Sequence, residues 1–225
     1  MATIEKLEKL AGLGSVSLAP KSDLSEAQQW LPLSARHKDP LLYLLSLRNG
    51  FYAFESALHV FPFSMLDCCN RQDLLRWNAP DLWKYAYSLD DDGLFCFAED
   101  VFGYQFCVHE DRIGHFDPET GAVSDLCGSL EEWAALMCSD FEVHTGYRVA
   151  HDWQASKGPL KIGNRLVPIY PFVTSEGTYE LSNLYEVNAV AGILSRAEFA
   201  RQIKAIPEGG HIRVVPRNVR RRDGS

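Results

Sequence analysis

The sequence predicts an α+β domain, in which helices pack against a central antiparallel β-sheet. Strands and helices follow one another without the strand–helix–strand regularity of parallel sheets. Between residues 88 and 142, aromatic residues alternate with polar ones and turn residues separate the runs. With 225 residues, of which 46% are hydrophobic and 12% aromatic, the chain can bury a substantial core unaided. No long linker divides it, so we expect one domain.

The middle of the chain has the clearest strand pattern. Phe95 and Phe97 flank Cys96, and the alternation resumes over residues 104–109. Short polar or glycine-containing segments then act as turns, which predicts a meander of three or four short antiparallel strands. Further extended segments are expected at residues 51–63, 165–173, 178–186 and 211–215.

Helix signals surround this meander. Apolar residues at helical spacing predict an N-terminal helix that ends near Gly12 or Gly14. Asp39 can cap a helix that has Pro40 in its first turn and stops at Asn49-Gly50. Residues 71–87 predict two short helices, broken at Pro80, with inward-facing Leu74, Leu75, Trp77, Leu82, Trp83 and Tyr85.

The second half of the chain has two capping-box patterns. Ser129 with Glu132 starts a helix whose buried stripe is Trp133, Leu136 and Met137. A last helix lies within residues 188–206, and the pattern leaves open whether it spans Gly192 or begins at a second capping box at Ser195. Residues 146–163 are expected to form a connector.

Charge is the most unusual property of the sequence. Fourteen Asp and Glu residues lie between residues 88 and 142, against one basic residue, Arg112. The formal net charge is −8, and without the Arg-rich segment 217–225 it would be −11, from 18 basic and 29 acidic residues. A body this acidic is a poor nucleic-acid surface, because it lacks the clustered Lys and Arg that displace counterions. It suits a basic partner instead.

The cysteines and the N-terminus bear on the compartment. No CxxC pair occurs, and a chain of this length does not need disulfides, so we expect reduced thiols at Cys68, Cys69, Cys96, Cys107, Cys127 and Cys138. No apolar signal region or membrane-spanning stretch is present in the sequence. The expectation is a cytoplasmic protein without a membrane partner.

Motifs for catalysis and cofactor binding are absent from the sequence. There is no GxSxG, P-loop, GxGxxG or HExxH pattern, so no catalytic residue, cofactor or metal is predicted. The best metal candidate is His109-Glu110-Asp111 with His115 and Asp117. It requires His109 and His115 on one face of a hairpin, and a solvated hairpin rim is the simpler interpretation. The vicinal Cys68 and Cys69 are interpreted as packing residues.

Three groups of segments resemble the SUKH superfamily, which includes bacterial immunity proteins and fungal cell-wall-synthesis regulators. They are Leu31-Pro32 with Leu44-Leu45 and Asn49-Gly50-Phe51, residues 97–103, and residues 117–121 followed by 129–133. Residues 171–203 are similar to an extension seen in some members. The resemblance implies a domain over residues 31–215, preceded by an N-terminal helix and loop over 1–30 and followed by a flexible Arg-rich tail over 216–225.

The same resemblance implies a non-enzymatic protein that binds and neutralises a cognate protein toxin. Toxins that are nucleases carry basic surfaces, which agrees with the acidic charge of this chain. Acidic residues would steer association and exposed aromatic residues would anchor it. The candidate partner-binding residues are Asp90, Asp91, Asp92, Glu99, Asp100, Phe102, Tyr104, Glu110, Asp111, Asp117 and Glu119. The alternatives are an intracellular adaptor or regulatory scaffold on the same fold and, less favoured, an enzyme or small-ligand protein.

Overall fold

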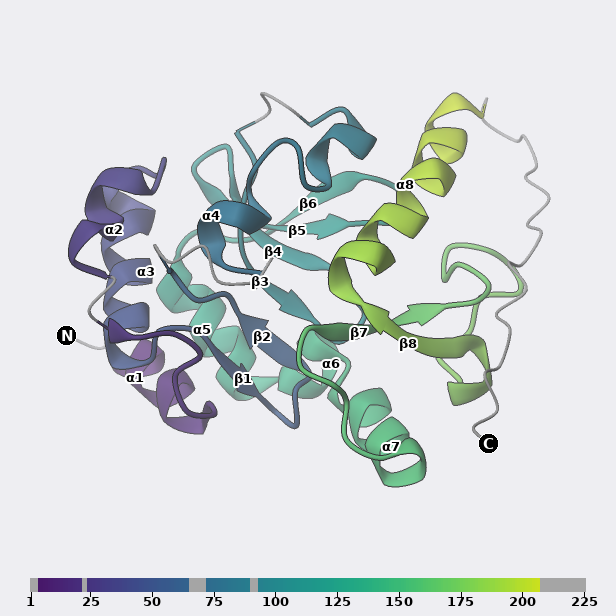
Figure 1. Cartoon of the computed structure of the whole chain (residues 1–225), viewed down its shortest axis with the longest axis horizontal. Coiled ribbons are helices and arrows are strands. Elements are labelled where there is room, and N and C mark those ends of the chain that lie inside the picture. The colour runs from purple at the N-terminus through teal and green to yellow at the C-terminus, as the bar shows by residue number, and fades with distance from the viewer. Residues whose placement is uncertain (1–3, 22–23, 65–71, 90–92, 207–225) are drawn as a thin grey trace.

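A six-stranded antiparallel sheet forms the centre of the molecule in the computed structural model, which describes residues 4–21, 24–64, 72–89 and 93–206. Its strands lie side by side in chain order, and helices cover both faces (Figure 1). They are β1 (Phe51–Ala53), β2 (Leu58–Val60), β3 (Phe95–Asp100), β4 (Gln105–His109), β5 (Arg112–Asp117) and β6 (Ala122–Cys127). The predicted α+β class is confirmed.

The meander predicted for the middle of the chain is the run from β3 to β6. Each strand pairs with the next, and the loop between β4 and β5 is only Glu110-Asp111. Both loop residues have positive φ, 48° and 57°, as a type I′ hairpin turn requires. Within this meander Cys96 and Cys107 are fully buried, as expected for small apolar side chains on a packed sheet.

The segment predicted as one extended stretch over residues 51–63 is a hairpin. β1 and β2 are three residues long each, and the turn between them places Phe54, Glu55 and Ser56 at positive φ. β2 then pairs with β3, so the hairpin extends the meander into the full sheet.

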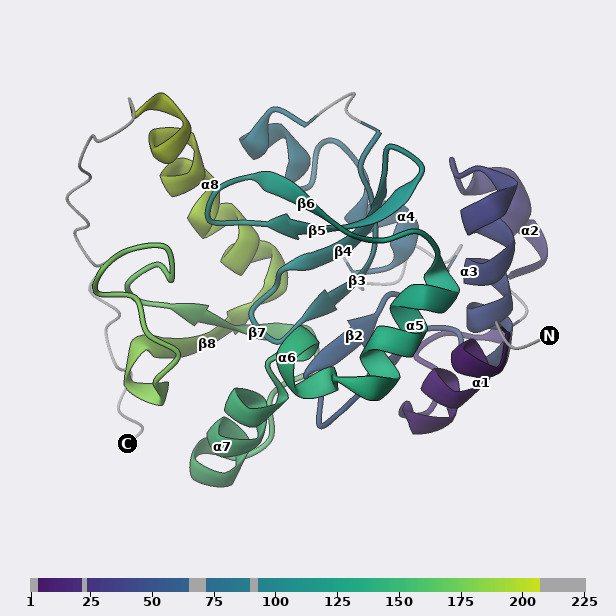
Figure 2. The ribbon, with the colours of Figure 1, turned by 180° about the vertical axis from the view of Figure 1, so that it is seen from behind.

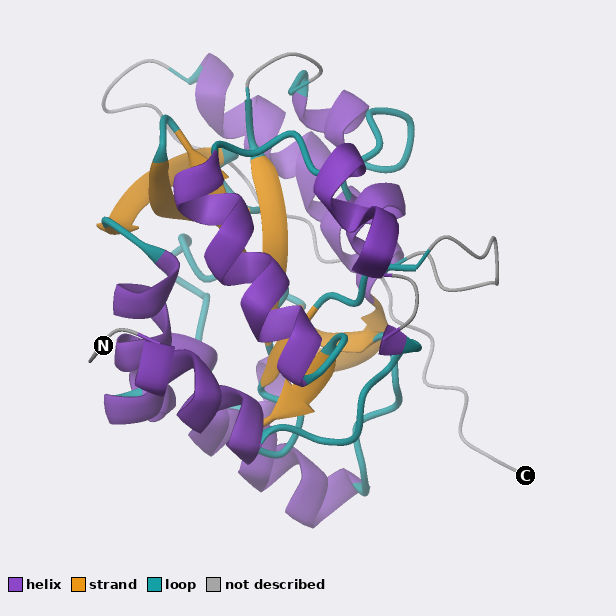
Figure 3. Cartoon of the chain, turned by 90° about the vertical axis from the view of Figure 1, so that its left-hand side faces the viewer, coloured by secondary structure: helices purple, strands orange, loops and turns teal. Residues whose placement is uncertain are grey.

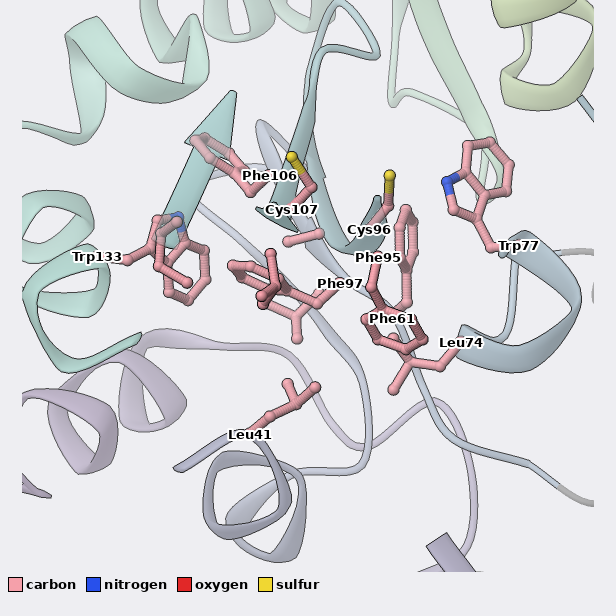
Figure 4. Packing of buried hydrophobic residues seen from close by; sticks show 14 of the residues in the cluster. Leu41, Phe61, Leu74, Trp77, Phe95, Cys96, Phe97, Phe106, Cys107 and Trp133 are labelled. Atoms are coloured by element: carbon pink, nitrogen blue, oxygen red, sulfur yellow. The ribbon is translucent and has the colours of Figure 1, made fainter. Parts of the chain in front are cut away.

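One face of the sheet is covered by α1 (Ile4–Leu13), α3 (Ala35–Leu47) and α5 (Leu130–Ser139), with α2 (Leu24–Trp30) beside α3. In the view from the side that carries the N-terminal helices, helices lie between the viewer and the strands (Figure 3). The capping box of α5 forms as predicted: the Ser129 hydroxyl accepts from the Glu132 amide, and the Glu132 carboxylate accepts from the Gly128 amide. Trp133 packs its ring 4.9 Å from that of Phe97 (Figure 4).

The helix α3 starts earlier than predicted. It begins at Ala35, so Pro40 lies inside it rather than in its first turn, and it ends before Asn49-Gly50 as expected. The Asn49 side chain is fully buried and exchanges hydrogen bonds with the backbone of Phe63, which fixes the chain after the helix against the end of β2.

The opposite face of the sheet is covered by α4 (Leu74–Trp77), the 3₁₀ helix η2 (Lys84–Tyr87) and α8 (Ala189–Ala205). Trp77 lies 5.1 Å from Phe61 and donates its indole N–H to the Gln105 side chain. Tyr85, expected to face inward, is 56% exposed, and Tyr87 is the buried tyrosine of this turn.

A two-stranded antiparallel sheet, β7 (Asn164–Pro168) with β8 (Leu184–Asn188), lies beside α8 on this face, and η3 (Leu181–Asn183) leads into β8. Both strands are shorter than the predicted segments. The helix α8 runs through Gly192 without a break. A Cβ at that position would lie 2.9 Å from Val167, so the absence of a side chain lets α8 approach β7 closely.

The predicted connector over residues 146–163 is wrong, because this segment contains the helix α7 (Tyr147–Lys157). It follows α6 (Phe141–Thr145) directly at Gly146, and both helices lie beyond the end of α5 (Figure 2). Ala150 and Trp153 are the buried residues of α7. Among the described residues, none of the helices combines the length and the apolar character needed to span a membrane.

Candidate functional site

The expected acidic rim is partly buried, and Glu99 departs furthest from the expectation. Its side chain is fully buried on the face that carries α4 and α8, where one carboxylate oxygen lies 2.8 Å from the Arg165 guanidinium. His59 and Gln72 contact the same oxygen at 3.2 Å and 2.8 Å. Burial alone would raise the pKa of Glu99, but the neighbouring Arg165 and His59 outweigh it and hold that pKa below its ordinary value. Glu99 is therefore corrected from a surface contact to a core ion pair.

Asp100 is also buried, but it lies on the opposite face of the sheet. Its side chain is 5% exposed, and one carboxylate oxygen accepts hydrogen bonds of 2.9 Å from the amides of Phe102 and Tyr104. These bonds close the turn between β3 and β4. Burial outweighs them and raises the pKa of Asp100 to about 7. Among the described residues no cation forms an ion pair with this carboxylate.

The turn after β5 holds the other buried acid. Asp117 accepts from the Glu119 amide and the Thr120 hydroxyl, so its carboxylate organises the turn. Glu119 is fully buried: one oxygen accepts from the Val173 amide, and the other has no partner among the described residues. Burial raises its pKa. Glu119 is corrected from a surface contact to an interior group.

Two of the predicted contacts lie on the surface as expected. Glu110 and Asp111 are exposed at the tip of the β4–β5 hairpin. Asp111 accepts from the Ser34 hydroxyl at 2.8 Å and pairs with Arg36 at 3.3 Å, so this hairpin is attached to the start of α3. The hydrogen bond from Ser34 and the positive charges nearby lower the pKa of Asp111. Asp90, Asp91 and Asp92 lie outside the described residues, as do Cys68, Cys69, residues 211–215 and the Arg-rich tail.

A cleft of about 370 Å³ opens beside Asp100, between the sheet and the helices α6 and α7. Phe102, Tyr104 and Phe106 line its sheet side, and Val143, Gly146 and Val149 line its helix side. Phe102 was expected to be exposed, but it is 5% exposed because its ring packs edge-on against Phe172. Tyr104 is half-buried in the cleft.

Gly146 sets the distance between the helices and the sheet at this cleft. Its φ is +69°, and a Cβ there would lie 2.5 Å from the Phe102 ring. Only glycine combines that backbone conformation with so close an approach. The turn between α6 and α7 at Gly146 therefore lies in close contact with the Phe102 ring and forms one side of the cleft.

His115 lies inside the cleft on β5. Its ring stacks on that of Tyr104, with centroids 5.2 Å apart and planes 13° apart. Burial lowers the pKa of His115 to about 4, so the imidazole is neutral at pH 7. Its Nε2 atom is buried and has no partner among the described residues.

The exposed part of the cleft carries charged and aromatic side chains. Glu142 and Arg148 are exposed and line it from α6 and α7. Tyr179 also lines the cleft; it is 57% exposed, and its ring stacks on that of Phe172 with the centroids 4.2 Å apart. None of these three residues was predicted as part of a site.

Two tyrosines line the cleft, and nearby carboxylates act on both of them. The pKa of Tyr104 and of Tyr179 is raised, first by burial and then by the carboxylates of Asp100, Asp117 and Glu119. The three predicted acids closest to the cleft therefore act together on its lining, although two of them are buried.

The hairpin metal site considered for His109 and His115 is ruled out by the strand register. His115 pairs with Phe106, three residues before His109 on the same strand, so the two imidazoles point to opposite faces of the sheet. Within the described ranges, no group of three His, Cys, Asp or Glu side chains has a geometry that could hold a metal ion.

The chain was compared with protein families, curated proteins and solved structures. No family model matches the chain, and no curated protein matches it. The structure is similar to that of Atu4351 from Agrobacterium tumefaciens, with a TM-score of 0.48 and 12% sequence identity over 83% of this chain and 85% of that chain. The fold is an α+β domain with a six-stranded antiparallel meander.

Proposed function

We propose that this chain is a non-enzymatic binding protein of the cytoplasm, which neutralises a basic protein toxin by occupying it with an acidic surface. The observation that carries the proposal is the cleft, where carboxylates and aromatic side chains converge on one opening. Interfaces draw most of their binding energy from a few aromatic and charged residues in such pockets. The resemblance to SUKH immunity proteins points in the same direction.

One exposed acid lines this opening, and a second lies close to it in the sequence. Glu142 lines the cleft, Asp140 lies two residues before it, and both are exposed. Among the described residues neither forms an ion pair, in contrast to Asp111 with Arg36 and to Asp125 with Arg112. Free carboxylates of this kind raise the rate at which a basic partner is encountered. Glu110, and the Asp90–Asp92 cluster of the sequence, would add to the same field.

An adaptor that binds a housekeeping protein is the alternative on the same fold. The adjacent gene distinguishes the two: a large secreted protein with a variable C-terminal domain favours immunity, and its absence favours the adaptor. The surface chemistry would be the same in both cases, since each needs an acidic face and aromatic anchors.

Co-expression tests the proposal directly. Where a candidate toxin domain is encoded beside this gene, cells that produce it should stop growing, and cells that also produce this chain should grow. Growth arrest in the presence of the folded chain would contradict the proposal. A variant in which Asp140 and Glu142 are both replaced by Lys should fold, because both are exposed, and should protect poorly.

A further inference from the structure

We propose that the cleft binds a cationic side chain, a guanidinium or an ammonium, that projects from the partner protein. Asp100 and Glu142 are the anionic contacts, and Tyr104 and Tyr179 are the aromatic walls. The inference rests on the proposed function for the identity of the partner. It adds the chemistry of the contact, which the proposed function leaves open.

The size of the cleft suits one long side chain. Its volume of about 370 Å³ lies near the lower end of ligand pockets, which begin at about 300 Å³. The aromatic and aliphatic lining of Phe106, Leu126 and Val149 can cover the methylene stem of Lys or Arg, while the charged head reaches polar groups.

Asp100 is prepared to receive a cation. Its carboxylate is held by two backbone amides, so it does not need to reorient on binding. Its carboxyl group is buried, lines the cleft and lacks an ion-pair partner among the described residues. Burial raises its pKa to about 7, so a cation bound in the cleft would favour its ionised form. Arg196 lies nearby, but its Nη1 donates to the Phe102 carbonyl and its Nε to the Gly192 carbonyl. Arg196 and Arg165 act on Asp100 at longer range, and a ligand cation would supply the direct ion pair that Asp100 lacks among the described residues.

The remaining groups of the cleft favour a cation over an anion. Glu142 adds a second carboxylate, and Asp117 and Glu119 lie close enough to act on both tyrosines. His115 is neutral at pH 7. Arg148 is the one Lys or Arg among the lining residues, and it is exposed, so its repulsion is screened by solvent. His144, which is half-buried, also lines the cleft.

Two tyrosines provide flat surfaces on which a guanidinium or ammonium can stack. Tyr104 is fixed by its stacking on His115, and Tyr179 by its stacking on Phe172. A cation over an aromatic face gains about 0.5–2 kcal/mol, with the larger values where water is excluded. This contact distinguishes a cation-binding cleft from a purely apolar groove.

The test uses two probes of nearly the same shape, one with a charged guanidinium and one with a neutral ureido group. The purified chain is titrated with N-acetyl-arginine amide and with N-acetyl-citrulline amide, and NMR shifts of the Tyr104, His115 and Gly146 signals are followed. The arginine probe should move these signals and bind at least about tenfold more tightly than the citrulline probe, which corresponds to about 1.4 kcal/mol.

Three variants and a control sharpen the result. Asp100→Asn keeps the oxygen that accepts from Phe102 and Tyr104 and removes the charge, and Glu142→Gln changes an exposed side chain, so both should fold. Each should weaken arginine binding several-fold. Arg148→Gln should strengthen binding of the arginine probe, because it removes a positive charge from the cleft. A substitution that only disturbed the structure would not produce this gain. Asp39→Asn, which changes an exposed side chain of α3, should leave the affinity for the arginine probe unchanged.

Equal binding of the two probes, or tighter binding of N-acetyl-aspartate amide, would overturn the inference. The co-expression result separates it from the proposed function. If the arginine probe binds but the chain does not protect cells from the toxin, the cation site is supported and the proposed toxin-neutralising function is contradicted. Protection that survives both Asp100→Asn and Glu142→Gln, with no probe binding, supports the function and contradicts the cleft.

Discussion

Glu99 and Arg165 form a fully buried ion pair, with 2.8 Å between the carboxylate Oε1 and the guanidinium Nε. The pair joins β3 of the central sheet to β7 of the two-stranded sheet. Arg165 also lies over the ring of Tyr52, 5.4 Å from its centroid. Because both charges are removed from water, each depends on the other.

Removing one partner of this pair should therefore be far more damaging than removing an exposed charge. Glu99→Gln or Arg165→Met should each lower the free energy of unfolding by about 3–5 kcal/mol, since a buried charge is left unpaired. The double variant Glu99→Gln/Arg165→Met should lose less than the sum of the two. Urea denaturation measures all three, and Asp81→Asn, which breaks the exposed Arg76–Asp81 pair, is the control that should change little. Additive losses would contradict the coupling.

Asp100 predicts a distinct dependence of stability on pH. Its pKa in the folded chain, about 7, is above its ordinary value of 3.8, so the native state binds the proton more tightly than the unfolded state. This contribution stabilises the fold at low pH and is lost as the pH rises through the folded pKa. Relative to Asp100→Asn, the wild-type chain should lose about 1 kcal/mol or more between pH 5 and pH 8.

Urea denaturation of the wild type and of Asp100→Asn at pH 5 and at pH 8 measures this loss of stability. Asp39→Asn, an exposed replacement of the same kind, should track the wild type at both. A difference between wild type and Asp100→Asn that is the same at pH 5 and pH 8 would mean that the carboxyl is not buried as described.

Gly146 should be intolerant of a side chain because of its contact with Phe102. Gly146 and Gly93 have nearly the same φ, +69° and +68°, but a Cβ at Gly93 would meet nothing within 4 Å. The strain of the left-handed conformation is common to both. We expect Gly146→Ala to lose about 2 kcal/mol more than Gly93→Ala, together with shifts in the NMR signals of Phe102. Equal losses would show that the corner can relax away from the sheet.

Much of the fold could be predicted because its signals are local. The β3–β6 meander follows from alternation and turns within each strand pair, and the start of α5 follows from Ser129 and Glu132. The helix α7 was missed because only Ala150 and Trp153 are buried in it. Two buried residues make too short an apolar stripe, so the sequence pattern of this segment does not distinguish a surface helix from a connector.

The site was harder to predict, because burial of a carboxylate depends on residues distant in sequence. Glu99 and Asp100 are adjacent, yet strand alternation sends them to opposite faces, one to Arg165 and the other to the cleft. A count of acidic residues treats the two alike. The cleft itself requires Glu142, Arg148 and Tyr179 from three later segments. Gly146 was the available signal, but the sequence does not indicate that it packs on Phe102.

The acidic cluster at Asp90, Asp91 and Asp92 gives a prediction that needs no structure. Replacing all three by Asn should slow association with a basic partner and flatten the dependence of the association rate on salt, because steering by charge is screened by ions. Stopped-flow mixing at low and high salt measures both. An unchanged association rate at low salt would exclude the cluster as a steering element.

The central claim is that a basic protein binds at the acidic, aromatic cleft. The most direct measurement is calorimetric titration of the toxin domain encoded beside this gene into the purified chain and into its Asp140→Lys/Glu142→Lys variant. We predict a tight complex with the wild type that weakens with salt, and at least about a hundredfold loss of affinity for the folded variant. No binding to the wild type, or equal affinity for the two proteins at low salt, would contradict the account.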